Sequence, residues 1–214
     1  MLVPSMTWEE IIAEVNADFI ALLKVMNFKI RNIGFRMQRL GETRFVETFH
    51  MKTDRMNDWT VILHVSPLKS EYCFYLKSFD RHGIVAYKIA QEGEGLMLVK
   101  FNSHFFKRYR ERMNLDIVKP EQVLKHFFKN NIDEKHATSD QHENGAQLAF
   151  FSYPNGMGIG RFDAEKSVVH MKTFITKELF NEQQKRMFEF MEGENRTADV
   201  LEVSLNTENF TNKF

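Results

Sequence analysis

The residue types best suited to chemistry lie together in one segment, residues 96–113, with the sequence LMLVKFNSHFFKRYRERM. His104, Arg108 and Arg112 are four residues apart, so a helix that begins at Ser103 places them along one ridge. Histidine titrates at about pH 6.5 and can act as an acid or a base, whereas arginine is a permanent cation whose forked donors match phosphate oxygens. The spacing therefore predicts a ridge suited to phosphate chemistry.

Two further elements must hold this ridge in place. Residues 96–101 are apolar and predict a strand that runs directly into the helix through Asn102 and Ser103. Proline is favoured at the first helical position, so Pro120 predicts the start of a second helix. Both helices have an apolar side that can pack on a sheet: Phe105, Phe106, Tyr109 and Met113 in the first, and Val123, Leu124, Phe127 and Phe128 in the second.

The chain begins with a predicted long helix. Thr7 and Glu10 form a capping box, and apolar residues keep a helical period as far as Leu40, ahead of Gly41. This period allows either one long helix or a break near residues 32–34. The following stretch alternates short runs rich in Val, Ile, Phe and Tyr with turn signals, which predicts an antiparallel meander. The expected strands are residues 45–52, 59–65, 72–79, 84–90 and 96–101.

After the second helix, residues 132–146 are polar and predict a loop. Three strands are expected next, at residues 147–153, 157–162 and 167–175, and Thr176 is expected to cap a closing helix over 177–192. The loop contains Asp133, Glu134, His136, Asp140, His142 and Glu143, whose spacing matches no standard metal site, so we expect neither a metal nor a cofactor. Gly156, Gly158 and Gly160 lie inside a hairpin and are expected to serve its turn, not to bind a dinucleotide.

These patterns predict an α+β protein. We expect a long N-terminal helix, an antiparallel β meander, a central helix pair, a β hairpin plus one strand, and a closing helix. A helical and β-rich lobe is expected over residues 1–95, a helix-plus-sheet lobe over 96–192, and a polar, frayed tail over 193–214. The two lobes are also compatible with one single domain.

Composition indicates a well-packed globular protein. Of its 214 residues 43% are hydrophobic, with 21 Phe against 10 Gly and 4 Pro. Lys plus Arg equals Asp plus Glu at 29 each, so the chain has no net positive charge that would indicate a nucleic-acid partner. Residues 100–129 are locally basic, with eight Lys and Arg against three acids. Such a segment is commonly only the solvated face of helices, and any nucleic-acid function must be local.

Cysteine usage and the first residues favour a soluble, cytoplasmic protein. Cys73 is the single cysteine, which is typical of a reducing compartment. The first 15 residues lack the basic and apolar regions of a signal peptide. No stretch approaches the roughly 18 apolar residues of a membrane span, so we expect no membrane association.

The pattern Ser-x-His-x-x-x-Arg-x-x-x-Arg, followed by a second helix and antiparallel strands, resembles the helix-plus-sheet ribonuclease superfamily of barnase, EndoU, colicin nucleases and RelE-type toxins. In its small uncharacterised members a His-Ala-x-x-Arg-x-x-Glu-Arg-Gly helix leads to a second helix, and the last strand carries a Thr. The resemblance covers roughly residues 96–180 and implies five catalytic residues: His104, Arg108, Glu111, Arg112 and Thr173.

This chain departs from the family pattern in two places. Met113 and Asn114 replace the glycine that follows Glu-Arg, which is tolerable because asparagine enters the left-handed region more readily than most residues. Residues 1–95 have no counterpart in the family.

Cleaving RNA without a metal needs a base for the 2′-hydroxyl proton, an acid for the leaving oxygen and cations for the charge on phosphate. His104 could be the base or the acid, and Glu111 could orient one of the arginines or act as the base. Strand alternation groups Thr173 with Met171 and Ile175, but His170 with Lys172 and Phe174. If the first group faces the core, His170 and Lys172 are the better partners. The substrate-binding candidates are Lys107, Arg110, His170 and Lys172.

The leading hypothesis is thus a metal-independent endoribonuclease-like domain or an inactive descendant of one, with RNA as its partner. One alternative is a non-catalytic module that binds a protein or RNA. Another is that the β-rich first half binds a small ligand and the basic helix is only structural. Each site residue also has a purely structural alternative: His104 only caps its helix, Arg108 and Arg112 are solvated or paired with Glu111, and Thr173 is an ordinary strand residue.

Overall fold

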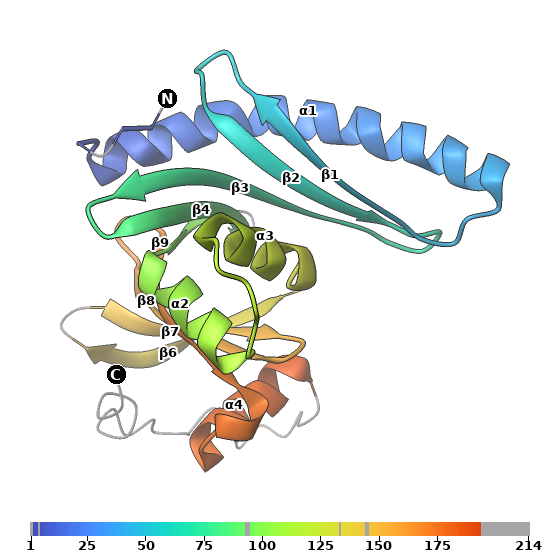
Figure 1. Cartoon of the computed structure of the whole chain (residues 1–214). Coiled ribbons are helices and arrows are strands. Elements are labelled where there is room, and N and C mark those ends of the chain that lie inside the picture. The colour runs from blue at the N-terminus through green and yellow to red at the C-terminus, as the bar shows by residue number, and fades with distance from the viewer. Residues whose placement is uncertain (1, 4, 93–94, 133, 144–145, 194–214) are drawn as a thin grey trace. The chain divides into compact units, whose positions relative to one another are not determined.

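The computed structural model of the chain describes residues 2–3, 5–92, 95–132, 134–143 and 146–193. Within them it contains four α-helices and nine strands, so the predicted α+β class is confirmed. The chain divides into two compact units, Met1–Leu98 and Val99–Phe214, each of which is taken by itself below (Figure 1). No helix among the described residues is long and apolar enough to cross a membrane.

Helix α1, Trp8–Leu40, is one continuous helix. The predicted capping box is present: Thr7 Oγ1 accepts a hydrogen bond from the Glu10 amide at 3.3 Å, and the Glu10 carboxylate accepts one from the Thr7 amide at 2.7 Å. Gly41 ends the helix in the left-handed conformation, with φ 68°. Of the two alternatives that the helical period allowed, the unbroken helix is the one observed, and residues 32–34 lie within it.

The first unit contains the antiparallel meander. Its strands follow in the order β1-β2-β3-β4-β5, and β1 to β4 pair antiparallel with their chain neighbours. Strand β5 begins in this unit and ends in the next. Helix α1 packs on β1 and β2. The strands are β1 (Phe45–Lys52), β2 (Asp58–Val65), β3 (Ser70–Asp80), β4 (Gly83–Glu92) and β5 (Gly95–Phe101).

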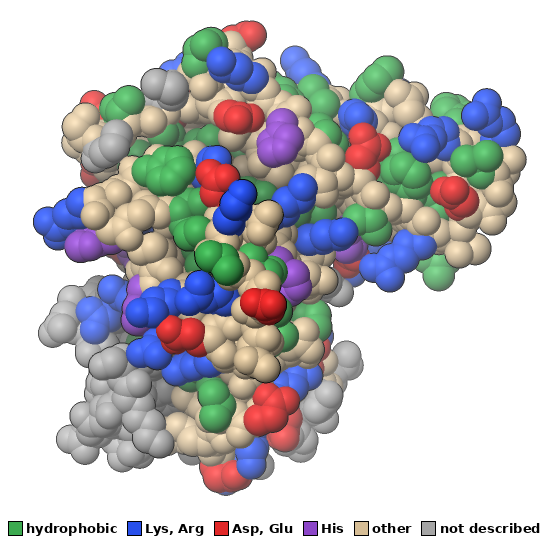
Figure 2. All heavy atoms as spheres, viewed as in Figure 1, with side chains coloured by type: hydrophobic (Ala, Val, Ile, Leu, Met, Phe, Trp, Pro, Cys, Tyr) green, Lys and Arg blue, Asp and Glu red, His purple; other side chains and the backbone are tan. Residues whose placement is uncertain are grey.

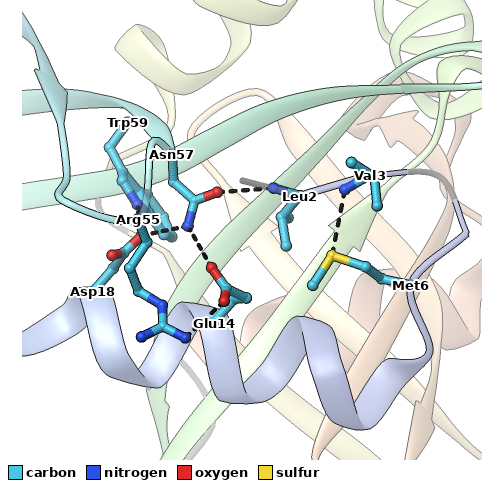
Figure 3. A network of polar contacts seen from close by, with 8 residues as sticks. All are labelled: Leu2, Val3, Met6, Glu14, Asp18, Arg55, Asn57 and Trp59. Carbon is cyan, nitrogen blue, oxygen red and sulfur yellow. Dashed lines mark hydrogen bonds and ion pairs between the residues drawn. The ribbon is translucent and has the colours of Figure 1, made fainter.

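A polar network fixes α1 to the turn between β1 and β2 (Figure 3). Asp18 is only 2% exposed, and its carboxylate accepts hydrogen bonds from Asn57 Nδ2 at 2.7 Å and Trp59 Nε1 at 2.8 Å. Asn57 Oδ1 also accepts a hydrogen bond from the Leu2 amide at 2.9 Å. Because these donors replace the water that a buried carboxylate loses, Asp18 can lie on the apolar side of the helix.

The second unit contains three more helices and a sheet with the strand order β5-β9-β8-β7-β6. Strands β6 to β9 pair antiparallel with their chain neighbours. The helices are α2 (Ser103–Arg112), α3 (Pro120–Asn130) and α4 (Glu182–Glu192), with a short 3-10 helix at Lys177–Leu179. The strands are β6 (Lys135–Glu143), β7 (Ala146–Tyr153), β8 (Gly156–Asp163) and β9 (Val168–Thr176).

Helices α2 and α4 cover opposite faces of this sheet. Phe174 of β9 contacts the ring of Phe105 in α2, whereas its neighbour Ile175 belongs to an apolar cluster with Phe188 and Met191 of α4. Successive side chains of a strand point to opposite faces, so the two contacts assign one helix to each face. Each face of β9 is therefore buried under a helix.

The prediction of a polar loop over residues 132–146 is wrong, because β6 and the start of β7 occupy most of it. Strand β6 lies at the edge of the sheet and pairs only with β7 among the described strands. An edge strand takes its hydrogen bonds from one neighbour and needs no continuous apolar run. Polar composition therefore concealed the strand; Asp133 and the side chains of Asp140, His142 and Glu143 lie outside the described residues.

The closing helix also begins later than predicted. Thr176 makes no side-chain cap, and the helix begins after Asn181, which forms a capping box with Gln184. Leu179, at the end of the short 3-10 helix before Asn181, has an exposed side chain. Of the tail predicted over residues 193–214, only Gly193 lies within the described residues, where it caps α4 with φ 77°.

Gly158 and Gly160 of β8 lie within the strand and allow close packing of its neighbours. A Cβ on Gly158 would lie 2.5 Å from Met171 Cε and 3.4 Å from Cε2 of Phe105 in α2. A Cβ on Gly160 would lie 2.7 Å from the carbonyl oxygen of His170 in β9. The missing side chains let α2 and β9 approach β8 closely, so the prediction of a turn role was wrong for these two residues.

Candidate functional site

Helix α2 starts directly after β5 and places His104 in its first turn. The side chain of Asn102 caps the helix by accepting a hydrogen bond from the Phe105 amide at 2.9 Å. His104 is exposed and, among the described residues, makes no hydrogen bond. It lies at the positive end of the helix dipole, where amide groups favour a nearby anion.

An aromatic cluster fixes the orientation of α2. Phe105, Phe106 and Tyr109 are buried as predicted, and Met113 is half-buried. The Phe127 ring of α3 lies at the centre of the cluster, with centroid distances of 5.1 Å to Phe105 and 5.0 Å to Tyr109. Its other ring contacts are Phe101, Phe106, Phe128, Tyr153 and Phe174. With the apolar side held against the sheet, the ridge lies along the flank of α2, and His104 at its start is exposed.

Arg112, at the end of the ridge, is bound to β9. Its Nη1 donates a hydrogen bond to Thr173 Oγ1 at 3.2 Å and a second, short one to the carbonyl oxygen of Phe174. Thr173 is 1% exposed and Arg112 is half-buried. Two of the residues that the resemblance named, 61 positions apart in sequence, are therefore in direct contact.

Arg108 and Glu111 form the middle of the ridge. Arg108 Nη1 lies 3.3 Å from the Glu111 carboxylate, and both side chains are partly exposed. The pair holds the guanidinium of Arg108 near His104. Partial burial lowers the pKa of His104 from its usual 6.5, and the positive charge of Arg108 lowers it further. The imidazole is consequently neutral at neutral pH and can accept a proton.

The two other cations of α2, Lys107 and Arg110, lie on the same flank of this ridge. At about 100° per residue, Lys107 is next to His104 and Glu111, and it is exposed. Arg110 lies about 60° beyond Lys107, on the side of the helix opposite to Arg108, and is half-buried. Figure 2 shows blue Lys and Arg side chains gathered around α2 with red acidic side chains among them. Lys107 therefore belongs to the ridge, and Arg110 does not.

A β-bulge in β9 alters the predicted alternation of its side chains. Ile159 pairs with Thr173 but Gly160 pairs with Met171, so Lys172 has no partner opposite it in β8. Thr173 and Phe174 are both buried, because helices cover both faces of β9, whereas Lys172 at the bulge is exposed. The predicted core set of Met171, Thr173 and Ile175 is therefore buried, and the division of β9 into two sets fails only at Phe174, which is buried as well.

His170 belongs to a different group of charges from His104. Burial lowers the pKa of His170 to about 4, and the cations Lys100 and Lys172 contribute. The charged neighbours that shift the pKa of His104 are Arg108, Lys107, Glu111 and Arg112. The two sets share no residue. The exposed Lys172 and the neutral His170 therefore belong to a second polar group on β9, whose charged neighbours differ from those of His104.

His126 of α3 is a residue that the sequence prediction missed. Its Nδ1 lies 3.0 Å from the hydroxyl oxygen of Tyr109, a hydrogen bond that joins α3 to α2. Burial lowers the pKa of His126, so the neutral ring faces Tyr109 at neutral pH. The signal in the sequence was its position among Val123, Leu124 and Phe127 on a predicted apolar face.

Asn114 adopts φ 49°, the left-handed conformation expected where the family has glycine.

Arg112→Lys is expected to lower the free energy of unfolding by about 1–3 kcal/mol, because an ammonium cannot reproduce the donor geometry that binds both Thr173 and Phe174. The matched control is Arg108→Lys, whose partly exposed ion pair with Glu111 is worth about 0–1 kcal/mol. Urea unfolding of the two variants measures both losses. Equal losses would show that the bonds from Arg112 to β9 do not stabilise the second unit.

No group of three or more His, Cys, Asp or Glu residues that could hold a metal ion is found in the part of the chain that the structure describes. The chain matches no family model, no curated protein and no solved structure at a significant level.

Proposed function

We propose that the second unit is a metal-independent endoribonuclease-like domain whose substrate binds along the ridge His104-Arg108-Arg112 of α2. The contact between Arg112 and Thr173 carries the proposal. The resemblance named these residues for a shared site, and no rule of helix or strand spacing requires them to meet. Their hydrogen bond gives the ridge a fixed orientation on β9, which a site for phosphodiester chemistry needs.

In the proposed reaction, the 2′-oxygen of a ribose attacks the adjacent phosphorus. The O2′–P bond forms and the P–O5′ bond breaks, which leaves a 2′,3′-cyclic phosphate and a free 5′-hydroxyl. His104 takes the proton of the 2′-hydroxyl, and water at the exposed ridge supplies a proton to the leaving 5′-oxygen. The neutral form of His104, favoured by its lowered pKa, is the form that a base needs.

The other residues of the ridge act on the phosphate. Arg108 donates to its non-bridging oxygens, and Glu111 orients Arg108 through their ion pair. Arg112 uses its Nη1 to bind β9, so its remaining N–H groups are the ones that can reach phosphate. Lys107 extends the cationic surface along the nucleic-acid backbone. The role of Glu111 as the base, the alternative that the sequence left open, is less favoured because its carboxylate is paired with Arg108.

The proposal is tested by incubating the full-length chain with single-stranded RNA in EDTA. We expect cleavage that continues when every divalent ion is chelated. The control is an Arg108→Gln, Arg112→Gln double variant, in which the phosphate loses its cationic donors. Binding without cleavage, with an affinity that falls steeply with salt, would instead support the non-catalytic RNA-binding module. With neither binding nor cleavage, the proposed function is wrong.

A further inference from the structure

The outward face of α1 exposes large apolar side chains. Ile20, Phe28 and Phe35 are 62%, 65% and 71% exposed. They lie on the side of the helix opposite to the buried residues Leu22 and Met26, which face the sheet. Scattered exposed apolar residues are ordinary, but these three recur along one stripe of a single helix. Figure 2 shows green and blue side chains side by side along this helix.

The charges of α1 change sign along its length. Its N-terminal half contains acidic residues and no basic ones, whereas its C-terminal half contains basic residues and no acidic ones. A helix with this charge distribution attracts a second copy of itself in the antiparallel orientation, since each acidic half then faces a basic half. Of the four acids, Asp18 is buried and Glu14 pairs with Arg55, so the acidic charge on the exposed side comes from Glu9 and Glu10. The bases are Lys24, Lys29, Arg31, Arg36 and Arg39, of which Lys29 pairs with Glu47.

The residues of the exposed stripe are arranged symmetrically about Lys24. In an antiparallel pair centred on Lys24, Ile20 of one copy lies opposite Phe28 of the other, and Ala13 lies opposite Phe35. The small side chain of Ala13 thus faces the large ring of Phe35, and Ala17 faces the long side chain of Arg31, which is the kind of shape match that helix packing requires. The stripe consists of residues 9, 13, 17, 20, 24, 28, 31, 35 and 39, and all nine are exposed.

In the same antiparallel pairing centred on Lys24, opposite charges also face each other at the two ends. Glu9 lies opposite Arg39 at both ends of the pair, because the two-fold symmetry repeats each contact. Lys24 meets its own copy on the axis, where its long stem can cover apolar surface while the ammonium group turns to water. The helix has 33 residues and is about 50 Å long, so the stripe offers an extended contact.

We propose that the protein forms a dimer in which α1 packs antiparallel against α1 of a second copy, through the stripe centred on Lys24. An anionic membrane surface is the main competing occupant, since Phe28 and Phe35 lie next to basic residues. It fits less well, because Glu9 and Glu10 lie at one end of the same face and such a surface would repel them. The proposal concerns the first unit and is independent of any activity at α2.

Phe28→Asp is expected to raise the dissociation constant of the dimer by at least about 100-fold, because two rings are lost and two carboxylates enter the apolar contact. The matched control is Leu68→Asp, which changes an apolar side chain that is 98% exposed in the turn between β2 and β3. The control should leave the dissociation constant unchanged. Sedimentation equilibrium of the full chain measures both, and far-UV circular dichroism checks that α1 remains helical.

A charge exchange tests the register itself. Arg39→Glu should weaken the dimer about tenfold, since it places like charges opposite each other at both ends. Glu9→Arg should do the same, and the two changes combined in one chain should restore the affinity. A monomer at all concentrations would overturn the proposal, as would a dimer insensitive to Phe28→Asp. A monomer that sediments with anionic phospholipid vesicles, and loses this property in Phe28→Asp, would assign the stripe to a membrane surface instead.

Discussion

Replacing His104 with alanine is expected to lower the rate of RNA cleavage by about 10²- to 10⁴-fold, the usual contribution of a general acid or base. The melting temperature should not change, because His104 is exposed and makes no hydrogen bond among the described residues. Single-turnover cleavage and a thermal melt measure the two quantities. A large loss of rate without a loss of stability would distinguish a catalytic His104 from a residue that only supports the helix.

The control is His82→Ala, which removes an exposed histidine from the turn between β3 and β4 in the first unit. Its rate should equal that of the unmodified chain. The pH profile adds a second readout: because the pKa of His104 is lowered from 6.5, the rate should fall only as the pH drops below 6.5. Arg108→Gln removes a positive charge that lowers the pKa of His104, so the fall in rate at acidic pH, the acid limb of the profile, should begin at a higher pH. A limb that does not move would contradict the assignment of His104 as the base.

Phe127→Ala is expected to cost the second unit about 3–5 kcal/mol of unfolding free energy, since it leaves a cavity at the centre of the aromatic cluster. Phe127 is 1% exposed and contacts rings of β5, α2, α3, β7 and β9. Losing it also removes the surface on which α2 rests, so the ridge should lose its orientation. Urea unfolding measures the change in free energy.

Phe190→Ala is the matched control, because this ring is 40% exposed on α4 in the same unit. Its cost should be well below that of Phe127→Ala, within the roughly 0.5 kcal/mol typical of surface substitutions. If both variants lost the same free energy, the aromatic cluster would not be the core of the second unit.

The elements with strong local signals were predictable from the sequence. The capping box at Thr7 and the glycine at position 41 mark both ends of α1, and they act through hydrogen bonds within a few residues. The apolar side of α2 follows from its helical period for the same reason. Fold class depends mainly on such local signals, and its prediction is confirmed.

Features set by distant partners were not predictable. Strand β6 is polar, and only its pairing with β7 makes it a strand. The bulge at Lys172 arises only where β8 and β9 pair. Phe174 is buried together with Thr173 because α2 and α4 cover opposite faces of β9, which the sequence of β9 alone does not indicate. Asp18 interrupts the apolar side of α1, and its donors Asn57 and Trp59 lie about 40 residues further along the chain.

The same distinction between local signals and contacts of distant residues applies to the candidate site. The spacing of His104, Arg108 and Arg112 determines which residues share the ridge, because a helix brings every fourth residue together. The contact of Arg112 with Thr173 is different, since 61 residues separate them and only the packing of α2 on β9 brings them into contact. The resemblance to a known family named both residues, whereas their spacing alone could not.

Identifying the ends of the RNA products formed in EDTA is the most direct test of the proposed chemistry at the ridge. We expect fragments that carry a 2′,3′-cyclic phosphate at one end and a 5′-hydroxyl at the other, because the ribose 2′-oxygen is the proposed nucleophile and His104 accepts its proton. Both products should disappear together in His104→Ala. Fragments with 3′-hydroxyl and 5′-phosphate ends, produced only when a divalent ion is added, would contradict the account.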